Sequence, residues 1–153
     1  HLWVCGPLDA EAEAKFRQAY HRELFSLPNI HALGWLNLRS PEFAQLANRC
    51  AYVIYPSCSE GQSGAVVNAM AHGIIPIVSR DSGIDTDDFG VTLPDTRVST
   101  IRRTVRDMAA LPPEQCAALA SSAHQTATQR YTEDNFRAKI DQILEQILPA
   151  ETR

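Results

Sequence analysis

The chain has 153 residues, of which 44% are hydrophobic and 21% charged, as expected for a single globular domain. Its formal net charge of −4 argues against a nucleic-acid groove, because such grooves carry an excess of basic residues. No apolar run reaches the length of a membrane span, no signal peptide opens the sequence, and Lys15 and Lys139 are too few lysines for a polybasic membrane anchor.

The first 50 residues predict two strands that alternate with helices. An apolar run over 2–5 ends at a Gly-Pro pair and predicts a buried strand. Apolar residues at helical spacing over 9–27 predict a helix capped by Asp9, and residues 30–33 predict the second strand. A short helix is expected over 41–50, because a Ser-Pro pair supplies its cap and first residue.

The middle of the chain carries the clearest alternation of strand and helix. Residues 51–55 predict a strand that ends at a proline, and a polar loop follows it. A helix is expected from about Ser63 to His72, where a glycine stops it. The β-branched run over 74–78 predicts another strand, and residues 89–93 predict a short edge strand.

The last third predicts three amphipathic helices, with apolar stripes over 98–111, 116–127 and 136–147 that we interpret as packing faces. The alternation upstream predicts an α/β fold with a Rossmann-like parallel sheet flanked by helices. Ligands bind such sheets at the carboxyl ends of the strands. The polar loop after the strand over 51–55 is therefore the place to look for function.

That loop leads into a helix in a way that suits a diphosphate. The first N–H groups of a helix have no partner within it, and the helix dipole adds positive potential there. Gly61 and Gly64 allow a ligand to approach the backbone closely.

Two side chains near the predicted anion site can hold the rest of a nucleotide sugar. The carboxylate of Glu60 accepts hydrogen bonds from sugar hydroxyls. Asn68 lies roughly 6 Å into the helix, at 1.5 Å per residue, within reach of a ribose. Taken singly, Glu60 is equally an ordinary loop acid, and Asn68 an ordinary amide on a helix surface.

An ordered set of motifs makes a stronger case than either residue. It comprises Pro56-Ser57, Glu60-Gly61, Asn68-Ala69-Met70-Ala71, Gly73-Ile74-Ile75-Pro76-Ile77-Val78 and Ser82-Gly83. This set resembles the core of retaining glycosyltransferases of family four (group 1), whose two Rossmann-like domains face each other in the GT-B architecture. The chain resembles their carboxyl-terminal, donor-binding domain over nearly its whole length.

The resemblance implies roles for individual residues. Glu60 is the expected catalytic-site residue, in contact with hydroxyls of the donor sugar. The expected sugar and phosphate site comprises Glu60, Gly61, Gln62, Ser63 and Gly64. The expected nucleoside site comprises Asn68, Gly34, Trp35 and Leu36, the last three acting largely through main chain.

The sequence departs from the family at Asn68, where the family has a second glutamate that grips the ribose. An amide cannot offer a carboxylate to two hydroxyls, so donor affinity or nucleotide choice is in question. The family's Arg and Lys that neutralise the leaving diphosphate are not in this chain. We therefore expect residues 1–153 to be an N-terminally incomplete donor-binding domain that begins inside a longer protein, without its acceptor-binding domain and inactive alone.

The expected function is transfer of a hexose from a nucleotide-diphospho-sugar to a sugar or lipid-linked acceptor, with retention, in polysaccharide or cell-envelope glycan synthesis. The alternatives are a degenerate module that binds nucleotide sugars without catalysis and, further off, a sugar-nucleotide epimerase. No metal or other cofactor is expected. The resemblance implies a cytoplasmic protein, with peripheral attachment at the inner face of the membrane as an option for the full-length protein.

Two further features are assigned no chemistry. Asp85-Thr86-Asp87 matches a manganese-binding pattern, but acids at this spacing are common in loops and we interpret it as solvated. Cys5 and Cys50 lie in or beside apolar runs, and we expect them to be small buried side chains.

Overall fold

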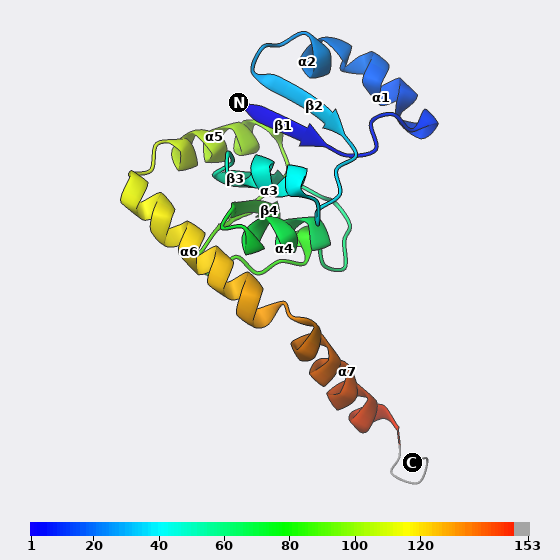
Figure 1. The fold of residues 1–153 in the computed structure, drawn as a ribbon, viewed down its shortest axis with the longest axis vertical. Coiled ribbons are helices and arrows are strands. Elements are labelled where there is room, and N and C mark those ends of the chain that lie inside the picture. The colour runs from blue at the N-terminus through cyan, green and yellow to red at the C-terminus, as the bar shows by residue number, and fades with distance from the viewer. Residues whose placement is uncertain (149–153) are drawn as a thin grey trace. The chain divides into compact units, whose positions relative to one another are not determined.

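The structure, a computed structural model, describes residues 1–148 (Figure 1). The expected domain therefore extends slightly beyond the described residues, to 153. The chain divides after Leu46 into two compact units.

The first unit is built around two parallel strands, β1 (Leu2–Cys5) and β2 (Ile30–Gly34), as the sequence predicted. The connection between them contains a 3-10 turn, η1 (Glu11–Glu13), and the short helices α1 (Ala14–Ala19) and α2 (His21–Phe25). Leu24 of α2 is buried, and this helix packs against β2. The helix α3 (Pro41–Ala47) follows, with the Ser40 hydroxyl accepting a hydrogen bond from the Phe43 N–H at 3.3 Å.

Several predictions for the first 50 residues are wrong. The helix expected over 9–27 is broken, because Tyr20 leaves the helical region at φ −114° and ψ 24°. Asp9 does not cap it: Ala10 precedes the first turn and no side chain bonds there. Cys5 is exposed, not buried, and Cys50 is half-buried. The strand β1, predicted to be buried, has no buried residue, because within the described chain its sheet has only two strands.

The second unit contains a three-stranded parallel sheet in the order β3-β4-β5. Its strands are β3 (Tyr52–Tyr55), β4 (Ile75–Ser79) and β5 (Val91–Leu93). Every residue of the central strand β4 is buried, whereas β5 is the short edge strand that the sequence predicted. The α/β class is thus confirmed, with the strands divided between two parallel sheets.

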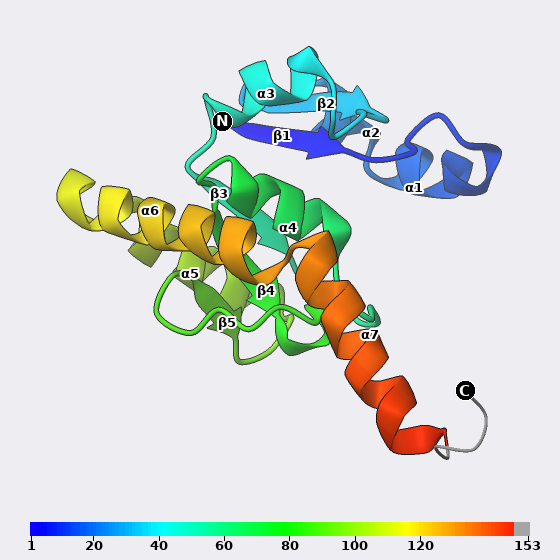
Figure 2. The same cartoon turned by 60° about the horizontal axis from the view of Figure 1, so that its bottom comes forward.

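Helices cover both faces of this sheet. The helices α4 (Gly64–Ala71) and α6 (Pro113–Arg130) lie side by side on one face, and α5 (Val98–Ala109) packs on the other (Figure 2). Alternate strand residues point to opposite faces. The α4 face buries Val66, Met70, Val78, Ile84, Phe89, Ala123 and Ala127. The α5 face buries Ile75, Ile77, Leu93 and Met108. This packing fixes the carboxyl ends of the strands, where ligands are expected.

The last helix, α7 (Glu133–Ile147), forms as predicted but does not pack as predicted. None of its residues is buried, and its apolar stripe includes Phe136 and Ile147 at 66% and 69% exposure. The helix extends away from the three-stranded sheet (Figures 1 and 2). Across residues 1–148 no helix combines the length and apolar character needed to cross a bilayer.

Candidate functional site

The candidate site begins where the loop after β3 turns into α4. The helix begins at the predicted place, and Ser63 caps it: its buried hydroxyl accepts from the Val66 N–H at 3.5 Å. Its own N–H donates to the Ser82 carbonyl at 3.0 Å, so Ser63 itself offers no free N–H to a ligand. The residues around it carry that role.

Four backbone N–H groups at this turn have no acceptor within residues 1–148: those of Gly61, Gln62, Gly64 and Ala65. All four residues are exposed. Two of them open α4, where the dipole of the eight-residue helix adds positive potential. The geometry predicted for an anion site is therefore accessible to solvent.

Glu60 is held next to this turn by a tyrosine that the sequence analysis did not single out. The Tyr55 hydroxyl, at the end of β3, donates to Glu60 Oε1 at 2.7 Å. The pKa of Tyr55 is raised, chiefly because this hydrogen bond to a carboxylate favours the protonated phenol. Glu60 itself is exposed, so its second oxygen is open to a ligand.

The loop after β4 packs against the loop that contains Gly61. The turn η2 (Arg80–Ser82) follows β4 and ends at Gly83, whose φ is +68°. A Cβ on Gly83 would lie 2.0 Å from the Gly61 carbonyl oxygen and 2.9 Å from Gln62 Cα, so only glycine fits. The Ser79 hydroxyl also donates to the Ser57 carbonyl at 2.5 Å. In the sequence, only Gly83, a few residues after the strand predicted over 74–78, pointed to this contact between loops.

Asn68 lies in α4 and is half-buried. Its Nδ2 donates to the Gly64 carbonyl, four residues earlier, at 2.8 Å. That bond uses one of the two N–H groups of the amide, and leaves the second N–H and the carbonyl oxygen for a ligand.

The other predicted nucleoside residues belong to the first unit. Gly34 ends β2 with a φ of +72°, and Trp35 beside it is 77% exposed. Leu36 is half-buried. Their part in binding a base remains a prediction.

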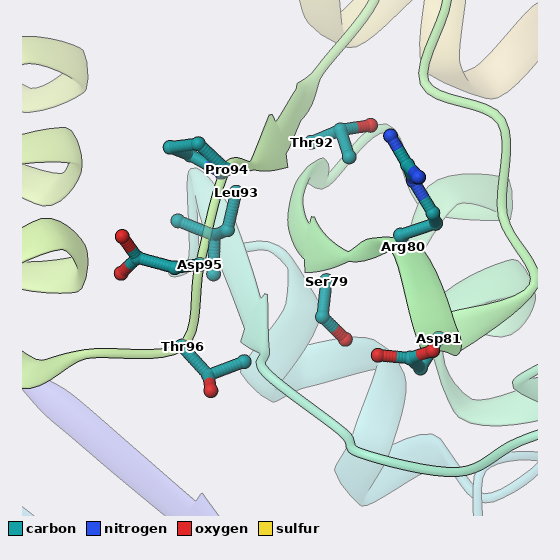
Figure 3. A pocket seen from close by; sticks show the side chains of 8 residues that line it. All are labelled: Ser79, Arg80, Asp81, Thr92, Leu93, Pro94, Asp95 and Thr96. Atoms are coloured by element: carbon teal, nitrogen blue, oxygen red, sulfur yellow. The ribbon is translucent and has the colours of Figure 1, made fainter.

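An open depression of about 530 Å³ lies at the carboxyl ends of β4 and β5 (Figure 3). It is lined by Ser79, Arg80, Asp81, Thr92, Leu93, Pro94, Asp95 and Thr96. In this depression Asp95 is occupied: Arg97 donates to it and holds the pKa of that carboxyl well below its usual range. Arg80 extends toward Thr92, away from Asp81. The depression is lined neither by Glu60 nor by any residue of α4.

The Asp-x-Asp pattern is engaged within the protein. Arg130 reaches Asp87 at 3.1 Å and Asp85 at 3.2 Å, and all three side chains are exposed. Across residues 1–148 there is no group of three or more His, Cys, Asp or Glu residues arranged to hold a metal ion. The carboxylates of this loop thus serve an ion pair with α6.

One family model and two solved structures of HepE match this chain. The family model described as "Glycosyl transferases group 1" matches residues 1–123. No curated protein sequence matches the chain. A crystal structure of HepE from Anabaena, in complex with UDP and glucose, has a TM-score of 0.74 and 18% identity. A second HepE structure, in complex with UDP-glucose, has a TM-score of 0.63 and 20% identity.

These structural matches cover different shares of the two proteins. Each covers 94% of this chain, but only 39% and 40% of the HepE chain. At such identities the matches establish the fold alone. The chain thus spans about two fifths of the length of HepE.

Proposed function

Because the chain belongs to the group 1 glycosyl transferases, we propose that it holds the donor of a glycosyl transfer, a nucleotide-diphospho-sugar. One observation carries this proposal: the unpaired N–H groups at the start of α4 stand beside the exposed carboxylate of Glu60. The amides suit the diphosphate, and the carboxylate suits sugar hydroxyls.

The same arrangement favours the transition state over the bound donor. When the bond between the sugar and the diphosphate breaks, negative charge grows on the leaving phosphate oxygen. Fixed N–H groups of Gly64 and Ala65 then gain more from that oxygen than they did before cleavage. Glu60 holds the sugar in position while an acceptor hydroxyl attacks its anomeric carbon. The family implies that the configuration at this carbon is retained.

A UDP-hexose is the donor class that we propose. The support comes from HepE, whose structures contain UDP with glucose and UDP-glucose. Gly34, Trp35 and Leu36 are the proposed contacts for the base. Asn68 is the proposed contact for the ribose, through its carbonyl oxygen.

The remaining machinery belongs, in this proposal, to a longer protein. An acceptor-binding domain would hold a sugar or lipid-linked acceptor, and cationic side chains outside this chain would neutralise the diphosphate without a metal. Synthesis of a polysaccharide or envelope glycan on the cytoplasmic side of the membrane is the proposed setting, with peripheral attachment through the other domain.

A second candidate is a nucleotide-sugar-binding module without catalysis. It is favoured by one observation: the amide of Asn68 donates to the Gly64 carbonyl within its own helix, where the family has a glutamate that binds the ribose. An assay of UDP-glucose hydrolysis or transfer by the complete protein separates the two candidates. Only the enzyme should release UDP.

The proposed site is tested by calorimetric titration of the complete protein with UDP-glucose and with UDP. Glu60→Ala should weaken UDP-glucose about tenfold, since it removes hydrogen bonds to a charged group, and should leave UDP within about twofold. Glu114→Ala, at an exposed glutamate of α6, is the control and should change neither. Equal affinities of the Glu60 variant and the wild type for UDP-glucose would remove Glu60 from the site.

A further inference from the structure

We propose that Tyr55 is the positioning residue for Glu60, fixing one carboxylate oxygen so that the other faces the donor sugar. This inference rests on the proposed function of Glu60 and adds a residue that sets how that carboxylate is presented. Its basis is the 2.7 Å hydrogen bond from the Tyr55 hydroxyl to Glu60 Oε1.

Glu60 needs such a partner. It is exposed in a loop, and within residues 1–148 its side chain makes no hydrogen bond other than that from Tyr55. An unrestrained glutamate samples many rotamers, and a ligand that needs one of them must offset the lost entropy. The phenol removes part of that freedom before the sugar arrives.

Tyr55 is well suited to act as an anchor. Its ring is half-buried and packs against the apolar cluster that contains Val66, Met70 and Val78. Its hydroxyl lies at the carboxyl end of β3, the edge where ligands bind parallel sheets. The packed ring thus holds the phenol hydroxyl in place, and the hydroxyl restrains the carboxylate of Glu60 on an exposed loop.

The same hydroxyl also connects the two halves of the donor site. The Ser63 side chain is near enough to the phenol to lower the pKa of Tyr55, against the larger effect of Glu60, and the Ser63 hydroxyl caps α4. Tyr55 therefore joins the carboxylate proposed for the sugar to the helix start proposed for the diphosphate. Because the hydrogen bond to Glu60 raises the pKa of Tyr55, the phenol remains a donor throughout the neutral range.

The hydrogen bond also sets the acceptor capacity of Glu60. Oε1 receives the phenol hydrogen, while Oε2 keeps its lone pairs for the ligand. Neighbouring hydroxyls of a hexose can both donate to one carboxylate oxygen. Tyr55 should thus favour donors that present such hydroxyls, and it should have no effect on a nucleotide without a sugar.

The test uses Tyr55→Phe in the complete protein, titrated with UDP-glucose and with UDP. The affinity for UDP-glucose should fall about threefold to tenfold, because one hydrogen bond to a charged group is lost. The affinity for UDP should stay within about twofold. The double variant with Glu60→Ala should bind UDP-glucose as weakly as Glu60→Ala alone, because Tyr55 acts through Glu60.

Tyr52→Phe is the matched control. Tyr52 lies in the same strand on the opposite face, and its hydroxyl donates to the Met108 carbonyl at 2.6 Å, away from Glu60. This variant loses a phenol hydroxyl from the same sheet, so it should lower stability without selective loss of UDP-glucose. Thermal unfolding of both variants measures the structural share of any effect.

The outcomes separate the two proposals. If Glu60→Ala binds UDP-glucose like the wild type, the proposed role of Glu60 fails and the positioning role of Tyr55 fails with it. If Glu60→Ala is impaired but Tyr55→Phe is not, only the positioning role is overturned. A loss of UDP affinity as large as that of UDP-glucose in Tyr55→Phe also overturns it, since it marks a general structural defect.

Discussion

A single methyl group on Gly83 should disturb both the stability of the second unit and its donor site. In Gly83→Ala the new Cβ would lie 2.0 Å from the Gly61 carbonyl oxygen and 2.8 Å from the Gly61 carbonyl carbon. Both are backbone atoms and cannot rotate away. Since carbon and oxygen rarely approach within about 3 Å, the loop must move by about 1 Å. The displaced loop contains the N–H groups proposed for the diphosphate.

The free-energy cost has two parts. Gly83 has a φ of +68°, where an alanine costs about 1–2 kcal/mol relative to glycine. Displacement of the packed loop adds a similar amount, so the free energy of unfolding should fall by about 2–4 kcal/mol. A shift of about 1 Å at a binding loop should also weaken UDP binding about tenfold or more. Urea unfolding and calorimetric titration measure the two effects.

Gly64→Ala separates stability from binding. A Cβ on Gly64 meets nothing within 4 Å, and its φ is not positive. The free energy of unfolding should therefore stay unchanged or rise by about 0.5–1 kcal/mol. UDP should nevertheless bind more weakly, because the methyl group occupies the approach to the helix start.

Wild-type stability and wild-type UDP affinity in Gly83→Ala would refute the reasoning about the loop after β4.

Two further predictions concern the ribose contact and the response to pH. In titrations of the complete protein, Asn68→Glu should bind UDP about threefold to tenfold more tightly, because a carboxylate accepts hydrogen bonds from both ribose hydroxyls. The native amide already donates to the Gly64 carbonyl. An unchanged or lower affinity for UDP would remove this position from the ribose contact. Burial, with Cys116 next to it, raises the pKa of Tyr52 to about 12 in the folded state. Its protonated form therefore stabilises the fold fully below about pH 10, and this stability is lost as pH rises toward 12. Between pH 9 and 11, urea unfolding should show the wild type losing about 1 kcal/mol more than Tyr52→Phe; equal losses would contradict the assignment.

Local chemistry explains which parts of the fold the sequence could predict. β4 contains the β-branched residues Ile75, Ile77 and Val78, and it is the fully buried centre of its sheet. The start and end of α4 were visible in Ser63 and in the glycine after His72, since a cap and a left-handed stop act within a few residues. The apolar periodicity also predicted α7, but it could not predict whether other elements pack against its apolar stripe, and no residue of α7 is buried.

The support of the candidate site could not be predicted, because it depends on contacts between distant segments. Gly83 approaches Gly61 only after β4 has paired with β3, and the Ser79 contact with Ser57 spans 22 positions in the chain. Tyr55 was interpreted as a strand residue, since nothing in an alternating pattern shows where its hydroxyl ends. The helix predicted before β2 is interrupted at Tyr20, where the backbone leaves the helical region, and the apolar spacing does not show that break.

The central claim is that the start of α4 holds a diphosphate while Glu60 holds the attached sugar. A crystal structure of the complete protein with UDP-glucose tests it most directly. We expect phosphate oxygens within hydrogen-bond distance of the Gly64 and Ala65 N–H groups, and a hexose hydroxyl on the Glu60 oxygen that Tyr55 leaves open. A diphosphate bound elsewhere, with Glu60 in contact with Tyr55 alone, would contradict the account.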